Sequence, residues 1–432
     1  MFVLFPLCLS QPALAKTVRR SAASLSAADN SIWKLKKILV KGNSKAKTRV
    51  ILQELNFPKS MRVNQKRIDI GISNLRNTNL FATVESELSP DKKTLTVMVA
   101  ERWTTIPILK VASGGNISEI TAGIFDPNLF GEFLEAGAQY QRIGDANSGV
   151  VWFKNPRLFG KRQGIDIQLW KTNRLRTKYD QASEAPVITN GFLQKRDRIY
   201  LGFDKEFNPY SRGTLSYEYH RDDFTSDFVS DEVRAILATQ GLPSETEVHF
   251  AGLSYEWGRL DTDEFLVDGT LLRSNLRVGF SPRENLDNFW NLDLNFQYFK
   301  TFMGRWTFAQ RLLAGYTSTE AIQYLYYLGG LDRIRGIADN RFSGSCFWLS
   351  NSELRIPLFE HPWVVLQAIG FLDLATTGVS FSELTTFGAA STGGGIRLFL
   401  PKLYRFVIRL DYAVPLVKQD DFSLSFGIQQ FF

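Results

Sequence analysis

Apolar and polar side chains alternate along the chain from about residue 104 to the C-terminus. The clearest stretch is residues 290–298, where one face carries Trp290, Leu292, Leu294, Phe296 and Tyr298. The residues between them are Asn, Asp and Gln, and residues 165–168 and 406–412 alternate in the same way. Because successive side chains of a strand point to opposite faces of its sheet, each segment predicts a strand with one apolar and one polar face.

The alternating segments run for about nine to twelve residues, long enough for a tilted strand to cross a bilayer and longer than most strands of soluble sandwiches. We count sixteen, beginning near residues 105, 117, 132, 148, 163, 197, 213, 247, 270, 290, 305, 346, 364, 391, 404 and 421. An even number is typical of bacterial barrels, and a sheet in lipid must close on itself. The pattern predicts a mainly β fold, with a transmembrane antiparallel β-barrel over residues 104–432. The alternative is a soluble β-rich domain.

Residues 33–103 have a different pattern and predict a small α/β domain. A short strand ends in a turn at Gly42-Asn43, two helical segments follow, and residues 82–101 form a hairpin. The two apolar helical faces consist of Val50, Ile51 and Leu55, and of Ile68, Ile72 and Leu75. Ser44 is the candidate N-cap of the first helix. The expected order is β-α-α-β-β.

Residues 1–15 predict a signal peptide, and residues 16–32 a linker. An apolar core over residues 2–9 precedes Ala13-Leu14-Ala15, which fits the small-x-small cleavage pattern. The alternative is a disordered apolar N-terminus. Export would remove Cys8 and leave Cys346 as the one cysteine, which argues against an internal disulfide and against a Cys-rich zinc site.

Charge is unevenly distributed. Residues 16–103 hold 18 Lys and Arg against 7 Asp and Glu, whereas the rest of the chain holds 33 against 37. Such a basic section favours contact with anionic lipid or acidic partners, although a solvated surface explains it equally well. Nucleic acid is a poor partner for an exported chain. The mean hydropathy is −0.14, and no run of eighteen apolar residues follows the leader, which argues against a transmembrane helix.

Residues 329–344, GGLDRIRGIADNRFSG, interrupt the alternation. They contain three arginines, two aspartates and four glycines in sixteen positions. The segment has neither the period of a strand nor the apolar stripe of a helix, so we expect a loop between the eleventh and twelfth strands.

Several motifs resemble, in order, those of the BamA/TamA outer-membrane assembly superfamily, also called the bacterial surface antigen family. The loop motif Ile334-Arg335-Gly336-Ile337 is similar to the family's Val-Arg-Gly-Phe or Tyr, with Ile337 replacing the aromatic. The other matches are FDPNLFG (125–131), NSELRIPL (351–358), GFLDLATTG (370–378), GGGIRLFLP (393–401) and LDYAVPL (410–416). The family usually has glycine at the position of Ala375. Residues 33–103 resemble a polypeptide-transport-associated (POTRA) domain in element order, in Gly42-Asn43, in Leu80-Phe81 and in Val99-Ala100-Glu101.

In this family the loop folds back into the barrel lumen, so the resemblance implies that Arg335 meets Glu353 and Asp373 on the inner wall. An arginine removed from water needs carboxylate partners, and its planar fork suits bidentate pairing. Loop glycines allow the backbone to turn tightly. The expected lumen latch consists of Arg335, Gly336, Glu353 and Asp373, with Gly329 and Gly330 as the loop glycines. The alternative is a solvated basic loop.

Members of the superfamily insert or export other proteins, which implies a function without catalysis and without a cofactor. The implied mechanism is strand addition at a weakly paired seam between the first and last barrel strands, and the hairpin at 82–101 offers a second edge. The candidate seam residues are Gly114, Gly115, Gly427 and Phe432. The implied location is the bacterial outer membrane, with the POTRA domain in the periplasm. The implied partners are outer-membrane lipid, unfolded client polypeptides and periplasmic helper proteins.

Other functions remain open at this point. One POTRA-like domain favours a dedicated translocator of a single substrate over a general assembly factor, and a passive barrel or surface antigen would keep the fold without transport. An enzyme is a further alternative, because His220 is near Asp222 and Asp223 in the sequence. However, His220, His249 and His361 have no metal-binding spacing, and a polar rim of the barrel is the simpler interpretation.

Overall fold

The computed structural model describes residues 31–114, 117–143, 146–180, 187–227, 229–283, 286–303, 305–330, 333–385, 388–417 and 423–428. The predicted signal peptide and most of the predicted linker lie outside the described residues. The same holds for two of the four candidate seam residues, Gly115 and Phe432.

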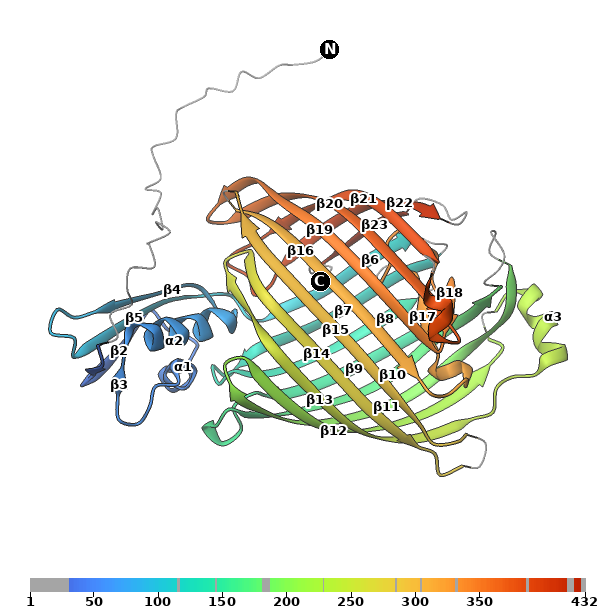
Figure 1. The fold of residues 1–432 in the computed structure, drawn as a ribbon, viewed down its shortest axis with the longest axis horizontal. Coiled ribbons are helices and arrows are strands. Elements are labelled where there is room, and N and C mark those ends of the chain that lie inside the picture. Colours follow the sequence, from blue (N-terminus) through green and yellow to red (C-terminus); the bar gives the residue numbers. More distant parts are fainter. Residues whose placement is uncertain are drawn as a thin grey trace, which may run out of the picture.

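Sixteen strands form one antiparallel sheet that curves into a barrel (Figure 1). They are β6 (Ile106–Gly114), β7 (Ile117–Leu129), β8 (Leu134–Ile143), β9 (Ala146–Asn155), β10 (Gln163–Tyr179), β11 (Ile188–Asn208), β12 (Ser211–Thr225), β13 (Thr246–Asp263), β14 (Leu266–Phe280), β15 (Phe289–Phe302), β16 (Trp306–Thr317), β19 (Cys346–His361), β20 (Val364–Gly378), β21 (Ala389–Phe399), β22 (Val407–Val417) and β23 (Ser423–Ile428). Each pairs with its neighbours in sequence, and β16 pairs with β19 across an intervening loop. The predicted fold class and strand number are confirmed.

The alternation of apolar and polar residues corresponds to the outer and inner faces of the barrel wall. On β13, Leu253 and Trp257 are exposed on the outer wall, whereas Glu256 lines a cavity in the mouth of the barrel. Trp290 and Leu294 are likewise exposed on β15. Exposed apolar side chains continue around the outer wall, as expected of a sheet whose outer face contacts lipid.

One strand begins well before its predicted start. β11 begins at Ile188 rather than near residue 197, and it pairs with β10 as far as Tyr179. Residues 194–198 are Gln-Lys-Arg-Asp-Arg, so both faces of this part of the strand are polar. The sequence therefore does not alternate there. The ladder with β10 nevertheless continues through this part of β11, so alternation alone does not reveal where the strand begins.

The N-terminal α/β domain has the predicted β-α-α-β-β order. Its three-stranded sheet consists of β2 (Lys37–Lys41), β5 (Thr94–Glu101) and β4 (Phe81–Leu88), with β5 in the middle and β2 parallel to it. Helices α1 (Thr48–Leu55) and α2 (Gln65–Asn77) contribute Ile51, Leu55, Ile68, Ile72 and Leu75 to the domain core. A two-residue ladder of β1 (Trp33–Lys34) and β3 (Arg62–Val63) is additional.

The predicted N-cap of α1 was wrong. The N-cap is Lys47, which makes no side-chain capping hydrogen bond. Ser44 lies in the preceding turn, and its Oγ donates to Glu101 Oε2 at 2.8 Å. The Ser44 hydroxyl group therefore binds a carboxylate at the end of β5 instead of capping α1.

Helix α3 (Asp231–Gln240) lies at the end of the barrel away from the N-terminal domain (Figure 1). The Ser230 side chain caps it by accepting a hydrogen bond from Val233 N. The described residues also contain three short 3-10 helices: η1 (Leu158–Gly160), η2 (Ile322–Tyr324) and η3 (Phe381–Thr385). Within the described part of the chain, every helix is too short or too polar to cross a membrane.

Candidate functional site

The long loop between β16 and β19 packs against the inner wall of the barrel. It contains a small hairpin of β17 (Tyr326–Leu328) and β18 (Phe342–Gly344). Ile334 and Ile337 are buried in one apolar cluster with Leu349 of β19 and Ala375 of β20. Ile337 therefore fills the position of the expected aromatic as a core residue, and the burial of the loop excludes the solvated-loop alternative.

Arg335 lies at the centre of the loop and contacts both predicted carboxylates. Its Nε and Nη2 donate to the two oxygens of Asp373, each at 2.8 Å, and its Nη1 donates to Glu353 Oε1 at 2.7 Å. The backbone N of Arg335 also donates to Asp373, at 3.2 Å. Its guanidinium carbon is 3.6 Å from the centroid of the Phe371 ring. Only 2% of Arg335 is exposed, so almost every donor of the side chain must find its partner within the protein.

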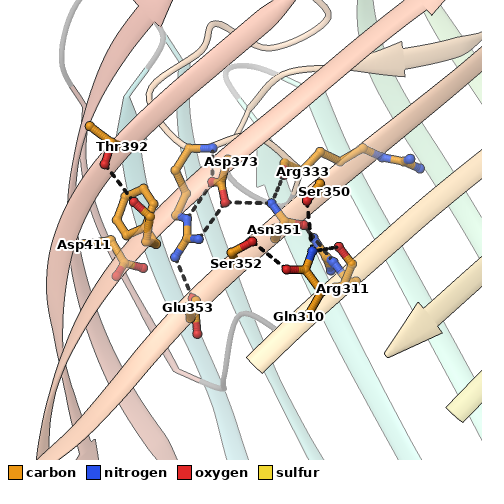
Figure 2. A network of polar contacts seen from close by, with 12 residues as sticks. Gln310, Arg311, Arg333, Ser350, Asn351, Ser352, Glu353, Asp373, Thr392 and Asp411 are labelled. Carbon is orange, nitrogen blue, oxygen red and sulfur yellow. Dashed lines mark hydrogen bonds and ion pairs between the residues drawn. The ribbon is translucent and has the colours of Figure 1, made fainter. Parts of the chain in front are cut away.

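The ladder between β19 and β20 explains this geometry. Glu353 lies opposite Phe371, and Asp373 is two residues further along the same face of β20. The guanidinium can therefore stack on the ring while one carboxylate lies at each side of it. Figure 2 shows Glu353 and Asp373 on neighbouring strands, with Asn351 beside Asp373.

Further charges complete the cluster around Glu353. Arg355 Nη2 is 2.8 Å from Glu353 Oε2, and Arg397 Nη2 is 3.7 Å from Glu353 Oε1. Arg397 in turn donates to Asp411 at 2.6 Å. Three guanidiniums thus share three carboxylates, so the buried charges of this set balance.

Asn351 links the loop backbone to the same cluster. Its Nδ2 donates to Asp373 Oδ1 at 2.8 Å and to the carbonyl oxygen of Arg333 at 2.9 Å. Its Oδ1 accepts from Arg311 of β16 at 2.6 Å (Figure 2). The loop is therefore held by its main chain as well as by the Arg335 side chain.

Sequence reasoning identified three members of this cluster and missed the others. The missed residues are Arg311, Asn351, Arg355, Phe371, Arg397 and Asp411. Their signal was present in the alternation, because Asn351 and Arg355 have the same parity as Glu353 and so lie on the same face. Arg397 and Asp411 lie within motifs that the resemblance had already matched.

The loop glycines adopt left-handed backbone conformations. Gly329 has φ 116°, and a Cβ built on it would lie 1.9 Å from the carbonyl oxygen of Ala338. Gly336 has φ 81°, but a Cβ there would lie 3.2 Å from the Cβ of Ala413. Position 329 therefore requires glycine because the backbone of Ala338 approaches it closely. Position 336 requires glycine mainly because of its positive φ angle. Gly330 (φ 76°) closes the turn by donating to the carbonyl oxygen of Ile337 at 2.8 Å.

The seam of the barrel lies between β6 and β23, which are side by side (Figure 1). Among the described residues no ladder joins these two strands, whereas a ladder joins each other adjacent pair of barrel strands. Six residue pairs, from Ile408↔Ile428 to Ala413↔Ser423, connect β23 to β22. Of the candidate seam residues that the structure describes, Gly114 ends β6, and Gly427 lies opposite Arg409.

Buried ion pairs join the N-terminal domain to the barrel. Glu54 of α1, which is 2% exposed, accepts from Arg157 Nη2 at 2.8 Å and lies 3.6 Å from Arg162 Nη2. Both arginines also contact Glu206 of β11, at 3.0 and 2.5 Å. Removing one member would leave the buried charges of this set unbalanced, so the docking depends on the whole set.

Other contacts between the N-terminal domain and the barrel lie at further points around the barrel rim. Lys45 Nζ is 2.5 Å from Asp126 of β7, and Arg259 of β13 donates to Ser73 and Asn74 of α2 at 2.7 and 2.9 Å. The backbone of Trp103 pairs with the turn between β21 and β22. A cavity of about 930 Å³ lies between the domain and the lumen. The domain thus sits across the mouth of the barrel.

His220 lies within the lumen rather than on a rim. It is buried on β12, and its Nε2 is 3.1 Å from Glu218 Oε2. Asp222 is held by Arg196 at 2.6 Å, while Asp223 alternates to the other face. The described residues contain no cluster of three or more potential metal ligands. Glu218 is paired with Arg198 at 2.9 Å, and the buried Nδ1 of His220 has no hydrogen-bond partner.

Residues 128–432 match the model of the Omp85 superfamily domain. The chain belongs to the Omp85 superfamily. This confirms the resemblance to BamA/TamA-type proteins and identifies the barrel as an outer-membrane barrel. A curated relative is the outer membrane protein assembly factor BamA of Nitratidesulfovibrio vulgaris, which is 23% identical over 312 residues. The match covers 70% of this chain and 37% of that relative, so the chain spans little more than a third of the relative's length.

Three solved structures share the fold of this chain. BamA from Haemophilus ducreyi lacking POTRA domains 1–3 matches with a TM-score of 0.53 and 16% identity, covering 91% of this chain and 84% of that one. CdiB from Escherichia coli matches with a TM-score of 0.60 and 15% identity, covering 92% and 76%. CdiB from Acinetobacter baumannii matches with a TM-score of 0.57 and 14% identity, covering 92% and 74%. At these identities the likeness establishes the fold of this Omp85 barrel.

Proposed function

We propose that this Omp85 protein inserts or translocates other polypeptides at the outer membrane, without catalysis and without a cofactor. The observation that carries the proposal is the seam, where β6 and β23 adjoin without a ladder among the described residues. An unpaired strand edge presents free N–H and C=O groups, which bind another strand largely independently of its sequence. A client strand would add to this edge.

The last strand is suited to moving away from the seam. Among the described residues it is attached to the rest of the sheet by six residue pairs with β22, whereas the described ladder between β10 and β11 is much longer. Gly427 contributes no side-chain packing to this short ladder, and Gly114 ends the other side of the seam. We assign both glycines to the opening of the seam, together with Gly115 and Phe432, which stay predictions.

The N-terminal domain provides a second site for strand addition. We interpret residues 33–103 as a POTRA domain in the periplasm. Its strand β4 lies at one edge of the three-stranded sheet, where it can accept an extended segment of an unfolded client. The basic surface of this section suits contact with outer-membrane lipid, and its exposed edge suits periplasmic helper proteins.

The loop cluster acts as a latch rather than as a ligand site. Arg335, Gly336, Glu353 and Asp373 hold the loop against the inner wall, with Gly329 and Gly330 forming its turn. The buried guanidinium is already bound by two carboxylates, which supports a structural role. The latch would keep the lumen filled while the seam exchanges strands.

A disulfide across the seam tests the proposed mechanism. In a background with Cys8 and Cys346 replaced by serine, Leu109→Cys on β6 is combined in turn with Leu424→Cys and with Phe426→Cys on β23. All three side chains are exposed on the outer wall. Oxidation should stop client assembly in cells, measured by proteomics of the purified outer membrane, and a reducing agent should restore it.

The matched control places a disulfide in the ladder between β6 and β7, which does not have to open in the proposed mechanism. Leu109 lies opposite Ala122 in the ladder of β6 and β7, so Leu109→Cys with Ala122→Cys forms a disulfide without closing the seam. This variant should support assembly in both redox states. Full activity of a completely oxidised seam variant would refute strand addition at this edge.

A dedicated translocator of one substrate is the second candidate function. It is favoured by the cavity of about 930 Å³ between the docked domain and the lumen, which gives an entering chain space at the mouth of the barrel. Depletion followed by proteomics separates the candidates. Loss of many barrels indicates a general assembly role, and loss of one exported protein indicates the dedicated translocator. No change in any protein leaves the passive barrel or surface antigen.

A further inference from the structure

Arg102 lies in the linker between β5 and β6 and lines the cavity at the mouth of the barrel. It is 9% exposed, and its Nε has no hydrogen-bond partner. The surrounding backbone is fixed on both sides. Arg102 N donates to the carbonyl oxygen of Leu80 at 2.9 Å, and Trp103 N donates to that of Lys402 at 2.9 Å. The backbone of Arg102 is therefore fixed, while its side chain forms no ion pair among the described residues.

Arg405, in the turn between β21 and β22, lines the same cavity. Its guanidinium carbon is 5.7 Å from the centroid of the Tyr404 ring, and its backbone has φ 44°, a left-handed conformation that long side chains rarely adopt. Among the described residues, neither Arg102 nor Arg405 forms an ion pair with a carboxylate. The mouth of the barrel thus presents two neighbouring cations that form no ion pair among the described residues.

Electrostatics around Arg102 agree with this geometry. Burial and the charge of Arg405 lower the pKa of the Arg102 guanidinium, while Tyr404 and Glu264 offset part of the effect. Glu264 is itself bound by Arg305 Nη2 at 2.7 Å. An anion that reached the pair would therefore relieve an unfavourable interaction, because an uncompensated buried charge is costly.

The other basic residues that line the cavity differ in this respect, because each has a carboxylate partner. The pairs are Arg157, Arg162 and Arg212 with Glu206, Arg259 with Asp261, Arg273 with Glu256, Arg355 with Glu353, and Lys154 with Glu135. The positive surplus of the cavity is therefore located at Arg102 and Arg405.

We propose that Arg102 and Arg405 bind a carboxylate of the polypeptide that enters the barrel mouth, either its C-terminal carboxylate or an acidic side chain. Guanidinium groups bind carboxylates through paired, charge-assisted hydrogen bonds. Phe265 and Phe399, whose ring centroids are 5.8 Å apart, line the same cavity and suit an apolar residue next to the carboxylate. The inference rests on the proposed transport function and names the feature of the client that the mouth recognises.

A polypeptide fits this cavity better than a lipid does. Its walls are inner-face residues of strands such as β8, β13 and β21, together with the N-terminal domain. The outer wall, where acyl chains lie, carries a different set of side chains. Access from the periplasmic end of the lumen is what a client chain needs, and a lipid would have to leave the bilayer to reach it.

The test measures binding to the purified full-length protein in an uncharged detergent by fluorescence polarisation. The probe is a fluorescein-labelled Ser-Gly-Ser-Gly-Phe peptide with a free C-terminal carboxylate. Its amide and an amidated Ser-Glu-Ser-Gly-Phe separate the two sources of the carboxylate. The wild type should bind at least one carboxylate-bearing peptide about tenfold or more tightly than the plain amide, since hydrogen bonds to charged groups contribute that much. Arg102→Gln and Arg405→Gln should each remove most of this difference.

Arg273→Gln is the matched control, because Arg273 lines the same cavity but is paired with Glu256; it should leave the difference in place. Equal binding of acid and amide by the wild type overturns the proposal, as does an equal loss in Arg273→Gln. Preferential displacement of the probe by dodecyl phosphate over the free-acid peptide would assign the pair to a lipid phosphate and overturn it too.

Heat-dependent gel mobility checks that each variant is folded, and Arg405→Gln, in an exposed turn, provides the test if Arg102→Gln does not fold. Binding is measured without client insertion. A failed seam experiment and a failed binding experiment are therefore separate results.

Discussion

Arg335 is buried in the barrel because its donors meet carboxylates that the sheet has already positioned. Glu353 and Asp373 lie on adjacent strands and are themselves at most 1% exposed. Neither carboxylate can turn to water if the arginine is lost. The cost of a substitution is therefore set by the groups left behind rather than by the arginine alone.

Arg335→Ala should lower the free energy of unfolding by about 3–5 kcal/mol, because it leaves buried charges unpaired. Arg335→Lys should also destabilise, since an ammonium group cannot reproduce the fork between Glu353 and Asp373. The measurement is urea unfolding of the full-length protein in detergent. Arg234→Ala is the control. Arg234 forms an exposed pair with Asp231, and its loss should cost about 0–1 kcal/mol. Equal effects of Arg335→Ala and Arg234→Ala would contradict the latch.

A glycine pair tests the backbone of the loop. Gly329→Ala should destabilise the protein by more than about 1 kcal/mol, because its Cβ would lie 1.9 Å from the carbonyl oxygen of Ala338 at φ 116°. Gly370→Ala is the control, since a Cβ there meets nothing within 4 Å. Limited proteolysis within residues 329–344 should speed up in the first variant alone. Similar cleavage of both would show that the loop tolerates displacement.

At the scale of elements, the strands were predictable and the caps were not. Lipid on one side and water on the other impose a period of two, so most strands were placed within a few residues of their observed starts. Where both faces are polar, as in residues 194–198, this constraint is absent and the start of β11 was missed. Ser44 was assigned to the wrong partner because the competing carboxylate, Glu101, lies 57 residues away in sequence.

Glu101 makes the N-terminal domain sensitive to acid. Burial opposes its ionised form, but hydrogen bonds from the backbone of Lys45, Ala46 and Ser44 and from the Ser44 hydroxyl outweigh it and lower the pKa of Glu101. Because the folded pKa lies below the unfolded value, the stabilisation is present above the ordinary value of 4.5 and is lost as pH falls through the folded pKa.

The prediction is a pH-dependent difference between the wild type and Glu101→Gln. At neutral pH the variant should exchange amide hydrogens faster in residues 44–55, because a neutral amide accepts these hydrogen bonds more weakly. The difference should shrink at acidic pH, when the wild-type carboxyl becomes protonated. Hydrogen–deuterium exchange mass spectrometry, comparing both proteins at each pH, provides the measurement. A difference that is constant across pH would mean that charge is not the cause.

At the scale of the whole molecule, the two ends of the barrel are filled by different segments. The loop with Arg335 packs on the inner wall, and the N-terminal domain sits across the mouth through Glu54, Arg157 and Glu206. Alternation says nothing about such contacts, since Glu54 and Arg157 are 103 residues apart. The resemblance led to the loop contacts but gave no information on the docking. Sequence reasoning likewise gave no residue pairs across the seam, where no ladder joins β6 and β23 among the described residues.

The loop with Arg335 and the N-terminal domain obstruct the lumen one after the other. This arrangement predicts how substitutions change the conductance in planar bilayers. Arg335→Ala should release the loop, and Arg157→Ala should loosen the domain by removing one of the two arginines that bridge Glu54 and Glu206. Because the remaining obstacle limits the current, each single variant should keep the small, flickering conductance expected of a filled barrel. The double variant should show a large and steady conductance. If Arg335→Ala alone opens such a pore, the domain does not obstruct the mouth, and the route of a client would bypass the Arg102 and Arg405 pair.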